Sequence, residues 1–129
     1  MKPQIISPAT SPKAVGPYNH AVRAGDLLFS SGQIPLNPST GQIEGTDIQS
    51  QSRRVLENIK NILESEGLGF RDVVKTTVFM TNLADFGAMN EVYSQFFTSD
   101  FPARSTVQVA ALPRNAQVEI EVVAHYSKP

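Results

Sequence analysis

The chain has 129 residues, a formal net charge of −1 at pH 7 and no cysteine. This length predicts one domain, residues 1–129, with a hydrophobic core of its own. The lack of cysteine excludes disulfides, thiolate nucleophiles and Cys-ligated zinc or iron–sulfur sites. The histidines, His20 and His125, are too far apart in sequence for a typical metal site. The near-neutral charge argues against general nucleic-acid binding.

The sequence shows no sign of a membrane or secretory destination. No apolar run approaches the length of a membrane span, and the N-terminus lacks the apolar core of a signal peptide. We therefore expect a cytoplasmic protein with no membrane partner.

A proline-rich arm opens the chain. Residues 1–17 contain four prolines, which predict an extended conformation. Gly16 and Pro17 stand directly before Tyr18 and favour a defined position for its ring. A tyrosine in such a place serves either packing or function, and the local sequence leaves both open.

A hairpin is predicted next, with strands at 21–24 and 27–33 around a Gly25-Asp26 turn. Ser31 and Gly32 interrupt the apolar pattern of its second strand. A glycine here indicates either a simple bulge or the close approach of another group to the backbone.

Two amphipathic helices follow, separated by a strand at 73–81 that carries apolar residues on both faces. We interpret that strand as central and covered on both sides. The first helix is predicted to begin near Thr46 with a capping box and to stop at Gly67. Its apolar stripe consists of Ile48, Val55, Leu56, Ile59, Ile62 and Leu63.

The second helix is predicted to start at Asn82, which has the side chain of an N-cap residue. Asn90 lies beside its apolar stripe and could belong either to the core or to a site. The stripe itself, which we interpret as core, consists of Phe86, Met89, Tyr93, Phe96 and Phe97.

The last 25 residues of the fold predict a second hairpin, with arms near 103–109 and 118–125 joined by a turn around Pro113. Alternation places Arg104 on one face of the first arm, and Glu119 opposite the apolar set of the second. We expect Arg104 and Glu119 to share one face of the hairpin. That face is either ordinary charged surface or the wall of a partly covered pocket.

This order of elements predicts an α+β fold, a mixed sheet with two helices on one face. The helices can cover only one side of the sheet. We expect the other side to carry Arg104, Thr106, Gln108 and Glu119 and to be buried by self-association, with pockets where copies meet.

Five short motifs give the chain a resemblance to the Rid family, also known as YjgF, over essentially its whole length, and most of all to its RidA subgroup. They occur in the family's order and spacing. The motifs are Gly16-Pro17-Tyr18, Ser30-Ser31-Gly32-Gln33-Ile34-Pro35, Val74-Lys75-Thr76-Thr77-Val78-Phe79, Phe101-Pro102-Ala103-Arg104-Ser105 and Val118-Glu119-Ile120-Glu121.

The resemblance implies a chorismate-mutase-like fold and a homotrimer with a barrel-like core. It implies three sites at subunit interfaces, with neither a metal nor an organic cofactor. It also implies hydrolysis of 2-aminoacrylate and related enamines or imines, such as 2-iminopropanoate and 2-iminobutanoate, to 2-keto acids and ammonia. Such a reaction protects pyridoxal-phosphate enzymes from a reactive metabolite.

Residue roles carry over from the resemblance. Arg104 would bind the substrate carboxylate through its planar fork of donors, and Glu119 would orient water or shuttle a proton. The substrate-binding set would comprise Tyr18, Ser31, Gly32, Asn90 and Thr106. Many RidA proteins carry cysteine in place of Thr106, so we expect a shifted substrate preference rather than lost activity. We assign Glu121 to structural pairing, and His20 and His125 to packing or the surface.

Two other functions remain open. One is the endoribonuclease or translation-inhibitor activity ascribed to some relatives, against which the lack of a basic stripe argues. The other is non-catalytic binding of small carboxylates by Arg104. Replacing Glu119 by alanine separates binding from turnover.

Overall fold

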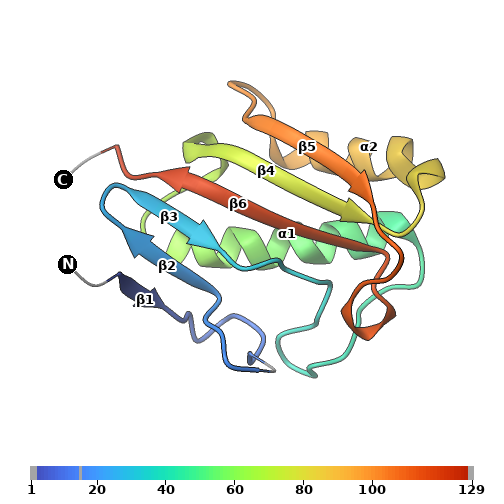
Figure 1. Cartoon of the computed structure of the whole chain (residues 1–129), viewed down its shortest axis with the longest axis horizontal. Coiled ribbons are helices and arrows are strands. Elements are labelled where there is room, and N and C mark those ends of the chain that lie inside the picture. Colours follow the sequence, from blue (N-terminus) through green and yellow to red (C-terminus); the bar gives the residue numbers. More distant parts are fainter. Residues whose placement is uncertain (1–2, 15, 128–129) are drawn as a thin grey trace.

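The computed structural model describes residues 3–14 and 16–127, which form one sheet with two helices on one of its faces (Figure 1). Neither helix in these ranges combines the length and the hydropathy needed to cross a membrane. The helices are α1 (Ile48–Ser65) and α2 (Phe86–Phe96), and short 3₁₀ turns lie at Phe70–Asp72, Leu83–Asp85 and Pro113–Asn115. The strands are β1 (Gln4–Ile6), β2 (Ala21–Ala24), β3 (Leu27–Ser30), β4 (Val73–Met80), β5 (Ala103–Gln108) and β6 (Val118–His125).

The strands lie in the order β1-β2-β3-β6-β4-β5. All neighbours are antiparallel except β4 and β5, which run parallel because α2 connects them as a crossover. The predicted hairpin of β5 and β6 is therefore wrong, since β4 lies between its two arms. Two apolar strands joined by a turn resemble a hairpin in sequence, and only long-range pairing shows that a third strand separates them.

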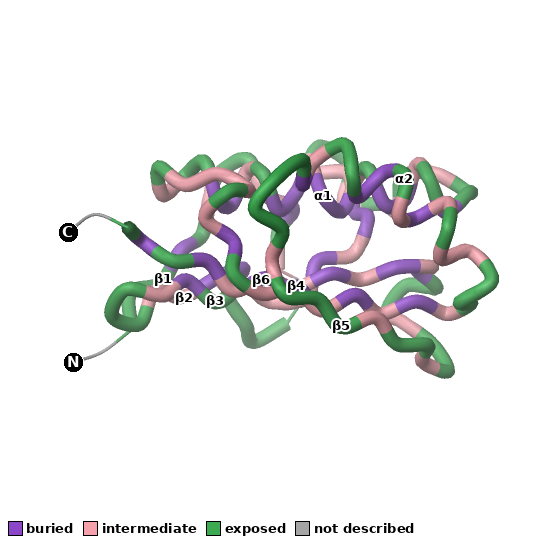
Figure 2. Tube along the Cα trace, turned by 90° about the horizontal axis from the view of Figure 1, so that it is seen from above, coloured by how far each residue is buried: buried purple, intermediate pink, exposed green. Residues whose placement is uncertain are grey.

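The central place of β4 is confirmed, but its cover is one-sided. Thr76, Val78 and Met80 are buried beneath the helices. Lys75 and Phe79 point to the opposite face and stay partly exposed. Figure 2 shows both helices on the same side of the sheet, with buried residues concentrated between the two layers. No element within residues 3–14 and 16–127 supplies the second cover predicted for β4, and this uncovered side of the sheet is called the open face below.

Helix α1 buries all six residues of its predicted stripe. It begins one residue later than expected, because Asp47 rather than Thr46 accepts the backbone N–H of Ser50, at 2.7 Å. The predicted stop is confirmed. Gly67 adopts φ 71°, and the N–H of Leu68 reaches back to the carbonyl of Leu63.

Helix α2 starts at Phe86, four residues after Asn82. Asn82 caps the preceding 3₁₀ turn instead, accepting the N–H of Ala84 at 3.0 Å. The aromatic stripe packs on the core as predicted, with Met89, Tyr93 and Phe97 buried and Phe86 and Phe96 partly so. A 2.9 Å hydrogen bond between the hydroxyls of Tyr93 and Thr76 ties α2 to β4.

The β2–β3 hairpin forms around Gly25 at φ 62°, as its glycine predicts. Regular pairing ends at Ser30, although Gln33 still bridges to Ile120 of β6. The extended N-terminal arm adds an unpredicted strand, β1, along the free edge of β2.

A buried asparagine on α1 holds the segment that follows β3. Asn58 is fully buried, and its amide nitrogen donates to the carbonyls of Leu36 at 2.9 Å and Ile34 at 3.4 Å. These carbonyls lie just beyond the Ser31-Gly32 stretch, so Asn58 anchors the backbone on which that stretch depends.

We predict that Asn58→Ala lowers the free energy of unfolding by about 2 kcal/mol, because the buried carbonyl of Leu36 loses its donor and that of Ile34 keeps only the N–H of Leu36. Urea denaturation at a fixed protein concentration measures the change. Asn61→Ala, one turn further along α1 at a partly exposed position, is the matched control and should stay within about 0.5 kcal/mol of the unaltered protein. Equal losses for the two variants would contradict the anchoring role.

Candidate functional site

Arg104 lies near the start of β5, opposite Thr76, on the sheet face that carries the helices. Its Nη1 donates to Oδ1 of Asn90 on α2, at 2.7 Å. The guanidinium carbon lies 4.7 Å from the ring centre of Tyr93 and 5.3 Å from that of Phe86. One hydrogen bond and two aromatic faces therefore fix the plane of this exposed cation.

A hollow of about 400 Å³ opens beside Arg104, between α2 and the segment that leads into β5. Its lining combines the cation with apolar surface and consists of Asn90, Tyr93, Ser94, Phe97, Phe101, Pro102 and Arg104. Thr106 follows on the same strand face, and its buried hydroxyl oxygen finds no hydrogen-bond partner among the residues that the structure describes. Asn90 and Arg104 are joined by the hydrogen bond above, and Thr106 is the next residue on the same face of β5. These three residues are called the arginine cluster below.

Glu119 lies on β6, opposite Phe79 of β4, and packs against Gly32. A Cβ atom at residue 32 would come within 2.2 Å of the carboxylate Oε2 of Glu119. The glycine is therefore explained by close approach, one of the two possibilities its sequence context left open. The group that approaches is the glutamate of the same chain.

Ser31 and Tyr18 lie on the segments next to Gly32. The Ser31 hydroxyl donates to the carbonyl of Asn19 at 2.5 Å, and its N–H donates to the carbonyl of His20 at 2.8 Å. Tyr18 is 41% exposed, and its ring meets that of His20 edge to face. Tyr18, Ser31, Gly32 and Glu119 are called the glutamate cluster below.

The two clusters lie on opposite faces of the sheet. Arg104 pairs with Thr76, whose side chain points to the helices, whereas Glu119 pairs with Phe79, whose side chain points to the open face. The prediction that Arg104 and Glu119 share a face is therefore wrong. Alternation orders side chains within a strand, but the relation between two strands depends on their register with β4. Thr106 and Gln108 likewise belong to the helix face.

The carboxyl of Glu119 is half-buried in an environment that disfavours its charge. Burial raises its pKa, and the negative charge of Glu121, two residues along the same strand face, raises it further. A carboxyl shifted in this direction can take up and release a proton closer to neutral pH than an ordinary glutamate. Sequence analysis had given Glu121 only a pairing role and missed its electrostatic effect.

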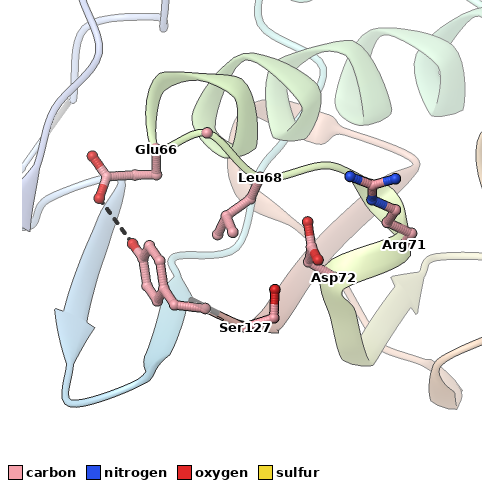
Figure 3. Close-up of a pocket in the computed structure, with 7 residues that line it drawn as sticks. Glu66, Leu68, Arg71, Asp72 and Ser127 are labelled. Carbon is pink, nitrogen blue, oxygen red and sulfur yellow. Dashed lines mark hydrogen bonds between the residues drawn. The ribbon is translucent and has the colours of Figure 1, made fainter. Parts of the chain in front are cut away.

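A second hollow, of about 190 Å³, lies beyond the C-terminal end of β6 and contains none of the predicted site residues (Figure 3). The hydroxyl of Tyr126 donates to Glu66 at 2.9 Å, and Asp72 accepts the N–H of Gly69. Burial and Glu66 both raise the pKa of Tyr126, which keeps the phenol protonated as a donor. The first bond ties the residue after β6 to Glu66, the C-cap residue of α1, and the second caps the 3₁₀ turn at Phe70–Asp72.

Within residues 3–14 and 16–127, no three His, Asp or Glu side chains gather in a way that could hold a metal ion. His20 is buried and His125 is exposed at the end of β6, in line with the packing and surface roles predicted for them.

Comparison with known proteins supports the fold and places the chain in a family. The family described as endoribonuclease L-PSP matches residues 8–126. The chain belongs to this family, also called YjgF or Rid. The crystal structure of the Escherichia coli YjgF gene product has a TM-score of 0.90 and 45% identity, covering 95% of this chain and 98% of that one. The predicted YjgF-type α+β fold is thereby confirmed.

Other Rid-family members bear informative names. Escherichia coli TdcF, solved with bound serine, has a TM-score of 0.91 and 47% identity over 96% of this chain and 99% of that one. A human protein, 2-iminobutanoate/2-iminopropanoate deaminase, is 44% identical over 121 residues, which is 94% of this chain and 88% of the human protein.

We predict that Gly32→Ala destabilises the protein by about 1 kcal/mol, because the new methyl group pushes the Glu119 side chain from its place. Urea denaturation at a fixed protein concentration measures this. Glu119→Ala removes the atoms that clash, so the double variant should lose no more stability than Glu119→Ala alone.

Gly87→Ala is the control, since a Cβ there meets no atom within 4 Å and α2 gains a better helix former. Additive losses in the Gly32→Ala/Glu119→Ala double variant would contradict the proposed contact.

Proposed function

We propose that this protein hydrolyses small 2-imino acids and their enamine tautomers to 2-keto acids and ammonia, in a site made by two copies of the chain. One copy supplies the arginine cluster and the next supplies the glutamate cluster. The observation that carries the proposal is a fixed guanidinium and a carboxyl of raised pKa on opposite faces of one sheet. The deaminase name of the human relative supports the reaction, and the serine bound to TdcF supports a small carboxylate ligand.

The open face of the sheet favours assembly. Phe29 and Val107 are exposed there at 41% and 42%, and partly buried Phe79 lies beside Val107. Apolar side chains on a sheet face with no helix cover are typical of a surface buried between subunits. We propose a homotrimer with a barrel-like core, in which the open face of each copy points inward. Light scattering at micromolar protein tests this stoichiometry.

The chemistry assigns a separate task to each cluster. Arg104 would hold the substrate carboxylate with its forked donors, while Asn90 keeps the guanidinium plane in place. Glu119 in its carboxylate form would take a proton from a water molecule as that water attacks the carbon of the C=N bond. That proton passes to the imine nitrogen as the carbinolamine forms. Glu119 then carries the proton of the carbinolamine hydroxyl to the nitrogen, and ammonia leaves as the C=O bond forms. Water is consumed, and no redox change occurs.

The remaining residues of the glutamate cluster would shape the pocket. Tyr18 and Ser31 offer hydroxyl groups, and Gly32 leaves its backbone accessible beside the Glu119 carboxylate. Because imines hydrolyse readily in water, orientation of the substrate and one water molecule is a sufficient source of rate enhancement.

The unaltered protein and the variants Arg104→Ala and Glu119→Ala also test two alternative functions. A non-catalytic binder of carboxylates would lose its affinity for the carboxylate in Arg104→Ala and keep that affinity in Glu119→Ala. The imine hydrolase also loses its function in Arg104→Ala, but in Glu119→Ala it binds and fails to turn over. The endoribonuclease activity named in the family description is tested by incubating labelled RNA with the unaltered protein and both variants.

Mixing two inactive variants tests the shared site. We expect Arg104→Ala and Glu119→Ala each to lower kcat/KM for 2-iminopropanoate about a hundredfold, by loss of a charge-assisted contact and of a proton carrier. Co-expression of the two variants in equal amounts should restore about a quarter of the sites, those that receive both intact clusters. Pyruvate release in a coupled assay, with the imine generated from serine by a dehydratase, measures the recovery.

The control replaces the Glu119→Ala partner by the Arg104→Ala/Glu119→Ala double variant, which cannot complete any site. Recovery in the control, or none in the test mixture, would show that the site is not divided between copies in this way.

The acid limb of the pH profile reports the carboxylate. Because the pKa of Glu119 is raised, kcat/KM should fall as the pH drops through a midpoint above 4.5, the ordinary value for glutamate. Glu121→Gln removes the second cause of the shift and should move the midpoint to lower pH. Both proteins are compared in one assay, so that the pH dependence of the substrate cancels. Coinciding acid limbs would contradict the electrostatic role of Glu121.

A further inference from the structure

Gln33 stands at the centre of a buried hydrogen-bond network behind the glutamate cluster. Its backbone exchanges two hydrogen bonds with Ile120, the neighbour of Glu119, at 2.8 and 3.1 Å. Its side chain is 3% exposed, and Nε2 lies 3.2 Å from the carbonyl of Ser31 and 3.3 Å from Nδ1 of His20. One amide thus contacts both the loop that carries Gly32 and the ring of a buried histidine.

These contacts assign the protonation of His20. The carbonyl oxygen of Ser31 can only accept, so the atom facing it must be the amide nitrogen of Gln33. The same nitrogen therefore donates to Nδ1 of His20, which carries no proton. The hydrogen of the neutral ring is then on Nε2, which is hydrogen-bonded to the carbonyl of Pro12. These hydrogen bonds require the neutral form of His20 whose proton is on Nε2.

His20 in turn supports both ends of the cluster. Its carbonyl accepts the N–H of Ser31, and its ring lies edge to face against the ring of Tyr18, with centroids 6.0 Å apart. The ring also anchors the proline-rich arm through Pro12. A turn of the Gln33 amide or of the imidazole would therefore shift Tyr18 and Ser31 together.

We propose that Gln33 and His20 act as a pair of positioning residues, in which the neutral Nε2–H form of His20 holds Tyr18 and the Ser31-Gly32 backbone in place against Glu119. The inference rests on the proposed imine hydrolysis. Neither residue touches the reacting atoms in this scheme. Small displacements of a catalytic group lower turnover strongly, whereas binding of the substrate carboxylate depends on Arg104 of the other copy.

Gln33→Glu is a sharp probe, because it keeps the size of the side chain and removes the donor. A carboxylate there would face the Ser31 carbonyl, another acceptor, and would attract a proton to Nδ1 of His20. The variant should release the Ser31 loop and change the ring to a form protonated at Nδ1.

Nitrogen-15 NMR of the imidazole rings tests the tautomer. The chain has two histidines, so His125→Gln leaves His20 as the only ring observed, and it alters an exposed residue outside both clusters. We expect the Nε2–H form in this protein and protonation of Nδ1 after Gln33→Glu is added. Gln33 and His20 are unaltered in the His125→Gln protein. An Nδ1–H tautomer of His20 in that protein would overturn the inference.

Steady-state kinetics with the coupled pyruvate assay tests the positioning role. His20→Leu and Gln33→Glu should each lower kcat about tenfold with a smaller change in KM. His20→Gln keeps a donor for Pro12 and an acceptor for Gln33, so it should stay within about twofold of the unaltered protein, as should the His125→Gln control. Thermal unfolding verifies that each variant is folded.

The outcomes separate the two proposals. If the unaltered protein hydrolyses the imine and His20→Leu and Gln33→Glu keep its kcat, the positioning role is wrong and the proposed function stands. If His20→Gln loses as much activity as His20→Leu, the hydrogen bonds are not the cause and the role is likewise overturned. An unaltered protein that does not hydrolyse the imine overturns the proposed function and this role with it, while the NMR result still decides the tautomer. Should His20→Leu fail to fold, Gln33→Glu and His20→Gln decide the kinetic half.

Discussion

The pairing of β4 between β6 and β5 is the constraint on which the rest of the molecule depends. It sets the register of both strands at once, through Thr76 with Arg104 and through Phe79 with Glu119. Since adjacent residues of β4 point to opposite faces, an even-numbered partner lies under the helices and an odd-numbered partner faces outward. A shift by one residue in either ladder would bring both charged groups to the same face, and a shift of β6 would turn the Glu119 carboxyl toward the core.

Buried polar side chains fix the position of the irregular backbone that lies outside this sheet ladder. Asn58 and Gln33 are both almost fully buried, and both direct their amides to backbone carbonyls of the segment that follows β3. Irregular backbone needs such partners, because it lacks the ladder bonds that satisfy a strand. The stretch from Ser31 to Leu36 is held in shape by Asn58 of α1 and by Gln33 within the stretch itself, and this fixes the position of Gly32 beside Glu119.

Elements with a strong period could be predicted from the sequence. The stripe of α1, the stop at Gly67, the β2–β3 turn at Gly25 and the aromatic core of α2 all follow from local spacing and glycine conformation. The close approach at Gly32 was one of two possibilities that the glycine signalled. Tyr18, Ser31, Gly32, Arg104 and Glu119 stand in the family motifs, whereas Asn90 was noted from its place beside the apolar stripe of α2 and Thr106 from the alternation of its strand.

The predictions that were wrong concern mainly the relation between segments that are far apart in the sequence. The β5–β6 hairpin and the shared face of Arg104 and Glu119 were inferred from alternation within each strand, which says nothing about a third strand inserted between them. The start of α1 moved from Thr46 to Asp47 because neighbouring residues can both cap a helix. The network of Gln33 and His20 joins residues 13 positions apart and has no periodic signal.

The two-faced arrangement of the sheet also bears on how activity would depend on protein concentration. With a shared site, a solitary copy holds every chemical group and completes no reaction centre. Turnover per chain would then climb with concentration until assembly is saturated, so dilute or newly synthesised material would be silent. Abundance would act as a built-in regulator, with no effector molecule required.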